Sequence, residues 1–100
     1  MLNLGKLAEP LRQEVKLWLR ITGTAMDSEV DQTIQAALMD LSMAGVAFLD
    51  PQDPLIRQAI KLYCKAQFGY EADSGKFAAA YEHLKSALTL CNDYREVPHG

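Results

Sequence analysis

The second half of the chain, taken as one unit, constrains the fold more than any other feature. Asp53 and Pro54 open a run with helical spacing, LIRQAIKLYCKAQFGY, which ends near Tyr70. After the polar loop EADSGK, a second amphipathic run starts near Ser74 and reaches about Asn92. Aspartate is a good helix N-cap, and proline suits the first helical position. The pattern predicts two helices joined by a turn, and it contains no group placed for chemistry.

The first of these two runs has an unusually broad apolar face. Its apolar residues cover about half of a helical wheel, more than the stripe of an ordinary surface helix. An arc this wide contacts more than one neighbour, so we expect the central helix of a bundle, or a helix shared between the core and an interface. The residues in this arc are Leu55, Ile56, Ala59, Ile60, Leu62, Tyr63, Cys64, Ala66 and Tyr70.

The first half of the chain predicts two further helices by the same spacing. One is expected from about Pro10 to Ile21, with proline in its first turn and Gly23 ending it. The second is expected to start at Asp27 or Ser28 as N-cap and to end near glycine 45, with aspartate 31 in a capping-box-like position. The inner faces predicted for these helices and for the last one consist of Leu11, Val15, Trp18 and Leu19; Val30, Ile34, Leu38 and Leu41; and Phe77, Tyr81, Leu84, Leu88 and Cys91.

Only Val46–Leu49 carries a weak strand signal, and it is bounded by Gly45 and by Asp50-Pro51. We therefore predict an all-α, small four-helix domain over residues 1–94, with either a loop or a short extended segment between its second and third helices. Residues 95–100 lack periodicity and are expected to form a tail that is mobile until a partner binds it.

Charge is segregated along the chain, although the net charge is only −3. Residues 21–56 contain six acidic residues and no lysine or arginine, whereas two sets of basic residues are spaced by four and so form stripes on helix faces. These stripes are either solvated surfaces or half of a head-to-tail contact in which the acidic start of one subunit's second helix meets a basic stripe of the next. The stripes are Arg12, Lys16 and Arg20 on the first helix and Arg57, Lys61 and Lys65 on the third; the acidic cluster is Asp27, Glu29 and Asp31.

Met39 and Met43 lie one turn apart on the second helix, opposite its apolar face. Methionine adapts well to contact surfaces, so both residues are candidates for a subunit interface. The alternative is that they cover a loop of the same subunit.

No pattern in the sequence indicates catalysis, a metal or a cofactor. The zinc-protease, P-loop and dinucleotide-binding motifs are absent, and neither His83 nor His99 has a recognisable serine or cysteine partner. Cys64 and Cys91 are too far apart for a zinc motif; both are predicted to lie in helices as small buried apolar groups, which fits a reducing, intracellular place of assembly. No apolar stretch approaches a membrane span, and the charged N-terminal region makes a secretory signal unexpected.

Two other kinds of function stay open from the residues alone. A small helical regulator could bind DNA, although an isoelectric point near 5.2 and an acidic start to the second helix disfavour contact with phosphates. A dimeric protein-interaction module is the other alternative.

The chain resembles the small head–tail connector proteins of tailed bacteriophages, the head-completion adaptors. Their opening E-V-K-x-x-L-R matches residues 14–20, and their D-x-x-V/I-x-x-A-I helix matches residues 53–60. The final amphipathic helix of the family corresponds to residues 77–90. The segment between the second and third helices, VAFLDPQ, is shorter than is usual in the family.

The resemblance implies a structural virion protein without enzymatic activity or cofactor. Its subunits would be assembled in the host bacterial cytoplasm into a ring, with the twelvefold symmetry of the portal, at the head–tail interface. The ring would dock under the portal protein after DNA packaging, would offer a platform to the stopper or tail protein, and would let DNA pass without sequence-specific binding. The tail residues Arg95, Glu96 and Val97 are candidates for docking to a partner.

Overall fold

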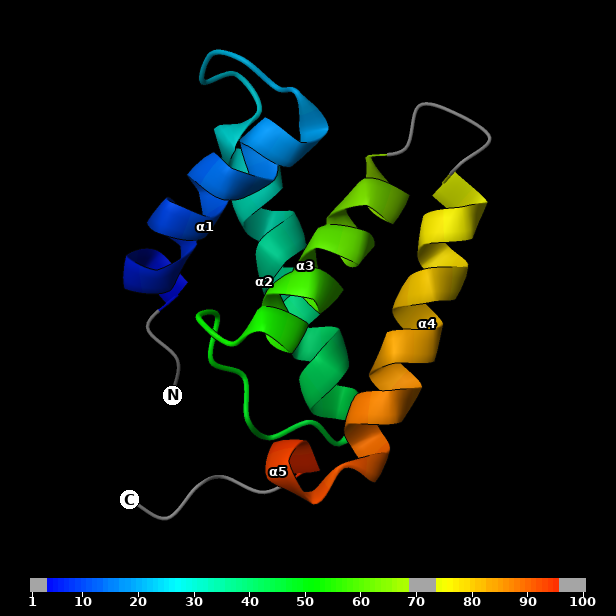
Figure 1. The fold of residues 1–100 in the computed structure, drawn as a ribbon. Helices are drawn as coiled ribbons and strands as arrows, with labels where there is room; N and C mark the ends of the chain where they lie inside the picture. The colour runs from blue at the N-terminus through cyan, green and yellow to red at the C-terminus, as the bar shows by residue number, and fades with distance from the viewer. Residues whose placement is uncertain (1–3, 69–73, 96–100) are drawn as a thin grey trace.

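The computed structural model describes residues 4–68 and 74–95, with side chains from residue 11 onward. These residues form helices only, and no strand occurs among them, so the predicted all-α class is confirmed. Figure 1 shows the arrangement of the helices. In chain order they are α1 (Leu4–Leu19), α2 (Asp27–Ala44), α3 (Pro54–Gln67), α4 (Ser74–Leu90) and the short α5 (Asn92–Arg95).

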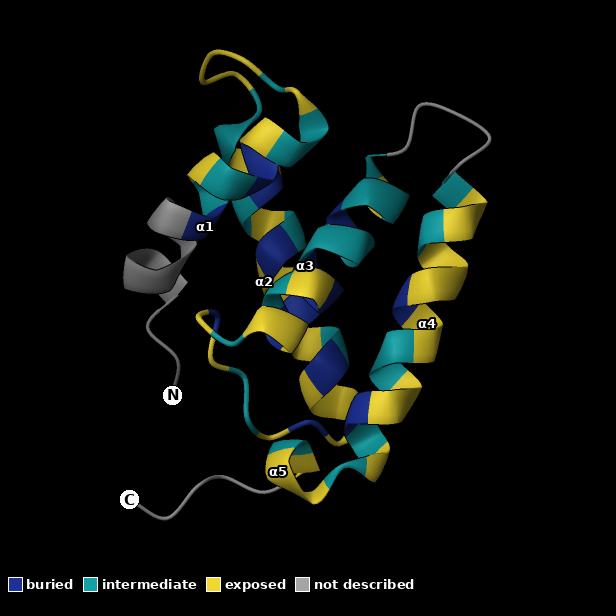
Figure 2. Cartoon of the chain, in the orientation of Figure 1, coloured by how far each residue is buried: buried dark blue, intermediate teal, exposed yellow. Residues whose placement is uncertain are grey.

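Helix α3 is the central helix, as its broad apolar face predicts. It packs against α1, α2 and α4, and it lies between them in Figure 1. Ile56, Ala59, Ile60 and Cys64 of α3 are fully buried. Apart from Phe77 and Cys91, the residues of the predicted inner faces of the other helices belong to the same core or pack against it, and Figure 2 marks the buried positions along the ribbon in dark blue. Burial of one large aliphatic side chain contributes about 1.5–3 kcal/mol, so this shared core is the main source of stability.

Helix α1 begins earlier than the sequence predicts. The expected start was Pro10, but the helix begins at Leu4 and continues through the proline. A proline inside a helix removes one backbone hydrogen bond and does not always end the helix. Leucines at positions 4, 7 and 11, spaced by three and four, carry the helical pattern past it.

Helix α1 also ends without the predicted glycine. Arg20 adopts a left-handed conformation with φ of 58°, and its N–H donates to the Leu17 carbonyl over 3.2 Å. The Ile21 N–H donates to the Lys16 carbonyl over 2.9 Å. This pair of bonds is a Schellman motif, although its left-handed residue is an arginine. Gly23 lies further along the turn.

The predicted caps of α2 are half right. Its end is confirmed: Gly45 has φ of 111°, and the Val46 N–H closes the last turn on the Leu41 carbonyl over 3.0 Å. The helix starts at Asp27, as predicted, but the predicted N-cap is wrong, because the N-cap residue is Met26, which makes no side-chain cap. Asp27 is the first helical residue, and its carboxylate binds a base of α1.

Helix α3 starts as predicted. The Asp53 carboxylate accepts hydrogen bonds from the Leu55 and Ile56 N–H groups over 3.0 and 3.2 Å, and Pro54 is the first helical residue. These bonds satisfy two of the backbone donors that a helix leaves free at its start. The predicted end near Tyr70 lies outside the described residues.

The segment between α2 and α3 is not a strand. The Ala47 and Phe48 N–H groups both donate to the Tyr94 carbonyl, over 2.7 and 3.0 Å, and the Phe48 ring meets the Tyr94 ring edge-on at 5.8 Å. Tyr94 belongs to α5, which the sequence did not predict. Helix α4 ends at Leu90 rather than near Asn92, so Cys91 lies in the break before α5 and is only half-buried, contrary to prediction.

Candidate functional site

Two acids of the predicted acidic cluster are bound within the subunit. Arg12 holds Asp31 with two parallel hydrogen bonds, Nε to Oδ1 over 2.8 Å and Nη2 to Oδ2 over 2.9 Å. Lys16 Nζ lies 2.6 Å from Asp27 Oδ1 and also donates to the Gly23 carbonyl. The Lys16 side chain is 9% exposed, so this charge is nearly buried, while its partner Asp27 is half-buried. These contacts join α1 to α2 and close the turn between them.

Glu29 is the acid of this cluster that stays open. It is exposed, and it makes no ion pair among the residues that the structure describes. It lies at a pocket of about 360 Å³ between the first half of α2 and the end of α3. The pocket is lined by Glu29, Gln32, Thr33 and Ala36 of α2 and by Tyr63, Gln67 and Phe68, from α3 and its C-terminal end. Its walls thus combine one carboxylate, two aromatic rings and several hydrogen-bonding groups.

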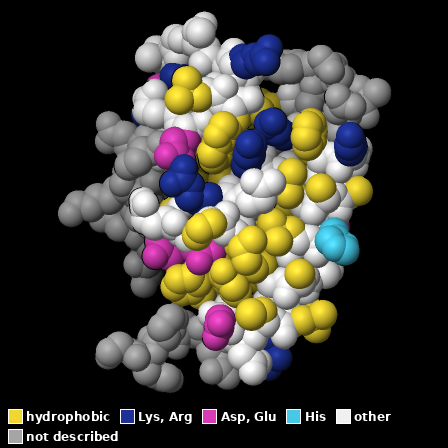
Figure 3. Space-filling model, viewed as in Figure 1, with side chains coloured by type: hydrophobic (Ala, Val, Ile, Leu, Met, Phe, Trp, Pro, Cys, Tyr) yellow, Lys and Arg dark blue, Asp and Glu magenta, His cyan; other side chains and the backbone are white. Residues whose placement is uncertain are grey.

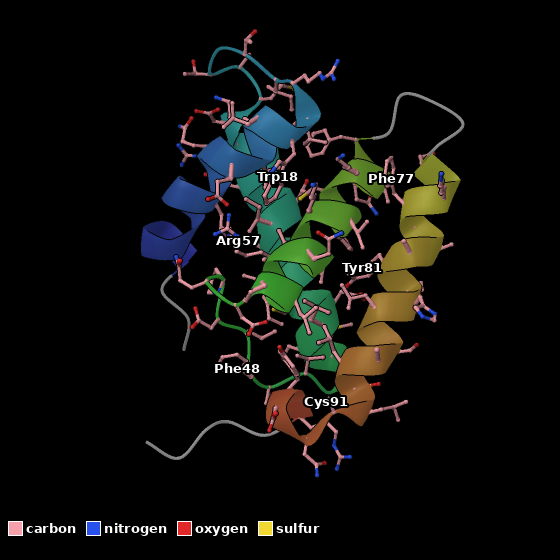
Figure 4. The ribbon with its side chains drawn as sticks, viewed as in Figure 1. Trp18, Phe48, Arg57, Phe77, Tyr81 and Cys91 are labelled. Carbon is pink, nitrogen blue, oxygen red and sulfur yellow. The ribbon has the colours of Figure 1, made fainter. Side chains whose placement is uncertain are left out.

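The basic stripe of α3 has different partners at each position. Arg57 pairs with Glu14 of α1. Lys61 Nζ lies 5.4 Å from the ring centroid of Trp18, and Lys65 Nζ lies 5.1 Å from that of Phe77. Figure 4 shows the two rings beside α3, one from α1 and one from α4.

Lys61 and Lys65 therefore keep their net charge at the surface. An aromatic ring attracts an ammonium group but does not neutralise it, and such a contact contributes about 0.5–1 kcal/mol at an exposed site. Neither lysine has a carboxylate partner within the described ranges. In Figure 3, Lys and Arg side chains gather in the upper half of the near face, and hydrophobic side chains gather below them.

Met39 and Met43 are both exposed, by 60% and 78%. They do not cover a loop in the described part of the chain, so that alternative loses its basis. Positions 29, 32, 36, 39 and 43 are spaced by three and four and thus share one face of α2. We call this face, formed by Glu29, Gln32, Ala36, Met39 and Met43, the outer face of α2. Its acidic end, at Glu29, lies beside the pocket, and its methionine end, at Met39 and Met43, lies toward the C-terminus of α2.

One polar network between helices was not predicted. The Tyr81 hydroxyl of α4 donates to Asp40 Oδ2 over 2.6 Å, and Lys85 Nζ donates to the same oxygen over 2.9 Å. The hydrogen bond from Tyr81, and then that from Lys85, lower the pKa of Asp40 below its ordinary value. Burial and the bond to Asp40 raise the pKa of Tyr81. The spacing of four between Tyr81 and Lys85 indicates that they share one face of α4. Their partner Asp40 lies 41 and 45 residues away in the sequence, so the spacing alone does not identify it.

The remaining candidates are placed as follows. Arg95 is exposed at the end of α5, and Glu96 and Val97 lie outside the described residues. Burial raises the pKa of the Cys64 thiol to about 12, which fits its predicted role in packing. Among the described residues, no three metal-ligating side chains come together, and no helix is long and apolar enough to cross a membrane.

Comparison with known proteins gives one match. The model of a family described as "Phage connector protein" matches residues 12–95, a range that covers nearly all of the described chain. No curated protein and no solved structure shows a significant match.

Proposed function

The chain belongs to the phage connector protein family, whose members are structural proteins of the phage head–tail connector, and we propose that it acts there as a ring-forming adaptor. In this proposal the ring docks under the portal protein after DNA packaging. It then offers a platform to the stopper or tail protein. The family match over residues 12–95 is the observation that carries the proposal.

Two features of the subunit support assembly into a ring. The outer face of α2 exposes two methionines one turn apart, and methionine adapts well to contact surfaces. The unneutralised lysines of α3 and the open carboxylate of Glu29 have opposite charge. A head-to-tail contact between such surfaces builds a closed ring when the rotation between subunits closes.

The predicted interface residues differ in whether they already have a partner within the subunit. Asp27, Asp31 and Arg57 have partners within the subunit, so a contact that uses them must share or exchange those partners. Glu29, Lys61 and Lys65 are open to a neighbour. The exposed pair Met39 and Met43 would supply the apolar part of the contact.

The proposal extends to the other partners and to the place of action. Twelve subunits would match the portal, and the tail from Arg95 through Val97 would dock to a partner protein. DNA would pass through the ring without sequence-specific binding, because a subunit with a net charge of −3 has little to gain from phosphates overall. Assembly would take place in the host bacterial cytoplasm, and the finished ring would carry no enzymatic activity.

Electron microscopy of the purified protein, alone at high concentration and mixed with isolated portal, tests the proposal. We expect closed rings in at least one of the two samples, and rings seated on the portal in the second. A protein that stays monomeric or dimeric in both would refute it. A band shift with duplex DNA in low salt would instead favour a DNA-binding regulator.

A further inference from the structure

The open charges of the subunit lie on opposite sides of α3. Residues two apart on an α-helix point about 200° away from each other around the axis. Lys61 and Lys65 therefore face away from Tyr63, which lines the pocket beside Glu29. In keeping with this geometry, no ion pair joins Glu29 to either lysine among the described residues.

The two surfaces also match along their length. The helices α2 and α3 run in opposite directions, because the start of α2 and the end of α3 line the same pocket. The acidic end of the α2 outer face is thus level with Lys65, and its methionine end is level with the start of α3. There Leu55 is 43% exposed, and its spacing of three and seven places it on one face with Gln58 and Leu62.

We propose that the outer face of α2 in one copy packs against the lysine-bearing face of α3 in a second copy, with Lys61 and Lys65 entering the pocket beside Glu29. The ammonium groups would find there a carboxylate and the aromatic faces of Tyr63 and Phe68. The methionine end would cover the apolar start of the second copy's α3. This inference rests on the proposed ring and names the surfaces that build it.

The contact has to be heterologous. In a twofold dimer each copy would have to offer its pocket and its lysines to the same partner, and these lie on opposite sides of α3. One copy therefore uses its pocket toward one neighbour and its lysines toward another. Contacts of this kind continue from copy to copy until they close.

Charge reversal on each side tests the pairing. Glu29→Lys makes both surfaces basic, and the double variant K61E/K65E makes both acidic. For each variant alone, we expect the protein concentration at which half of the subunits are assembled to rise at least tenfold. Analytical ultracentrifugation measures this concentration. An equimolar mixture of the two should assemble again, because each variant's pocket then meets the opposite charge on the other. The triple variant, with all three changes, should assemble by itself.

Two further measurements keep the result interpretable. Asp93→Lys makes the same change of charge in α5, away from both surfaces, and should assemble like the original protein. Trp18, the one tryptophan of the chain, stacks under Lys61, so its fluorescence should change on assembly. Far-UV circular dichroism checks that each variant is folded, because K61E/K65E also removes the contacts of the two lysines with the rings of Trp18 and Phe77.

The outcomes separate the inference from the ring itself. Rings that form equally well with E29K or with K61E/K65E would overturn the inference and leave the proposed function standing. Assembly lost in E29K but kept in K61E/K65E would indicate an α2-to-α2 contact and would also overturn it. If the original protein assembles neither alone nor on the portal, both proposals fail.

Discussion

Replacement of Tyr81 by phenylalanine isolates the polar network that joins α2 to α4. The change removes the hydroxyl that donates to Asp40 over 2.6 Å, and it keeps the ring that packs edge-on against Tyr63 at 5.2 Å. Lys85 remains bound to the same carboxylate oxygen over 2.9 Å. The variant therefore tests one hydrogen bond with little change in packing.

The expected cost follows from the kind of bond and its exposure. Hydrogen bonds to charged groups contribute about 1.5–3 kcal/mol, and the Asp40 side chain is 33% exposed, so water can replace part of the loss. We expect Tyr81→Phe to lower the free energy of unfolding by about 1.5 kcal/mol at pH 7. For a domain of this size, that lowers Tm by roughly 6–12 °C.

The cost should depend on pH with a definite sign. The pKa of Asp40 is lowered in the folded protein from an ordinary value of 3.8, so its stabilising contribution is present above 3.8 and is lost as pH falls through the lower, folded value. The difference between the original protein and Tyr81→Phe should be constant from pH 5 to pH 8. It should shrink as pH falls below 3.8 toward the lowered pKa of Asp40 in the folded protein, where the carboxylate of the folded state becomes protonated.

Urea unfolding followed by circular dichroism, at pH 7 and pH 3, measures both effects. Tyr63→Phe is the matched control, because the Tyr63 hydroxyl makes no hydrogen bond within the described residues; its expected change is within about 0.5 kcal/mol. A cost below about 0.5 kcal/mol for Tyr81→Phe at pH 7, or the same cost at both pH values, would show that the bond to ionised Asp40 does not stabilise the fold.

Three other substitutions or reactions test the core and the turns. Ile60→Ala, in the fully buried face of α3, should cost about 2–5 kcal/mol in urea unfolding, and a smaller cost would mean that α3 is not central to the core. Gly45→Ala should cost roughly 1 kcal/mol, because the φ of 111° strains any residue with a Cβ although no atom lies within 4 Å of it; an unchanged midpoint would argue against the left-handed end of α2. A thiol reagent at pH 8 should modify Cys91 in the folded protein and spare Cys64, whose pKa is raised to about 12; equal rates for both thiols would contradict the burial of Cys64.

Features that depend on neighbours in the chain were predictable. The cap of Asp53 on α3 and the left-handed glycine after α2 follow from residue types at fixed offsets, and both are present. The broad face of α3 identified the central helix because apolar spacing reports how many neighbours a helix must contact.

Features that depend on which of several partners a residue binds were not predictable from the sequence. Asp27 and Asp31 stand at sequence positions typical of helix-capping residues, but each carboxylate binds a basic side chain of α1 instead. An ion pair in a partly buried site is stronger than a capping hydrogen bond exposed to water. In the same way, the backbone of residues 47 and 48 pairs with α5 rather than with a strand.

The sequence by itself determined the approximate positions of α1 to α4 and which face of each is apolar, because the 3.6-residue period is a local property. Only the tertiary structure decided which charged side chains form ion pairs within the subunit and which do not. Lys16 and Lys61 belong to stripes with the same spacing, but Lys16 is buried against Asp27 and Lys61 lies over the ring of Trp18. The energy of a charge depends on its distance to other charges and on its exposure to water, and both are set by helices far apart in the chain.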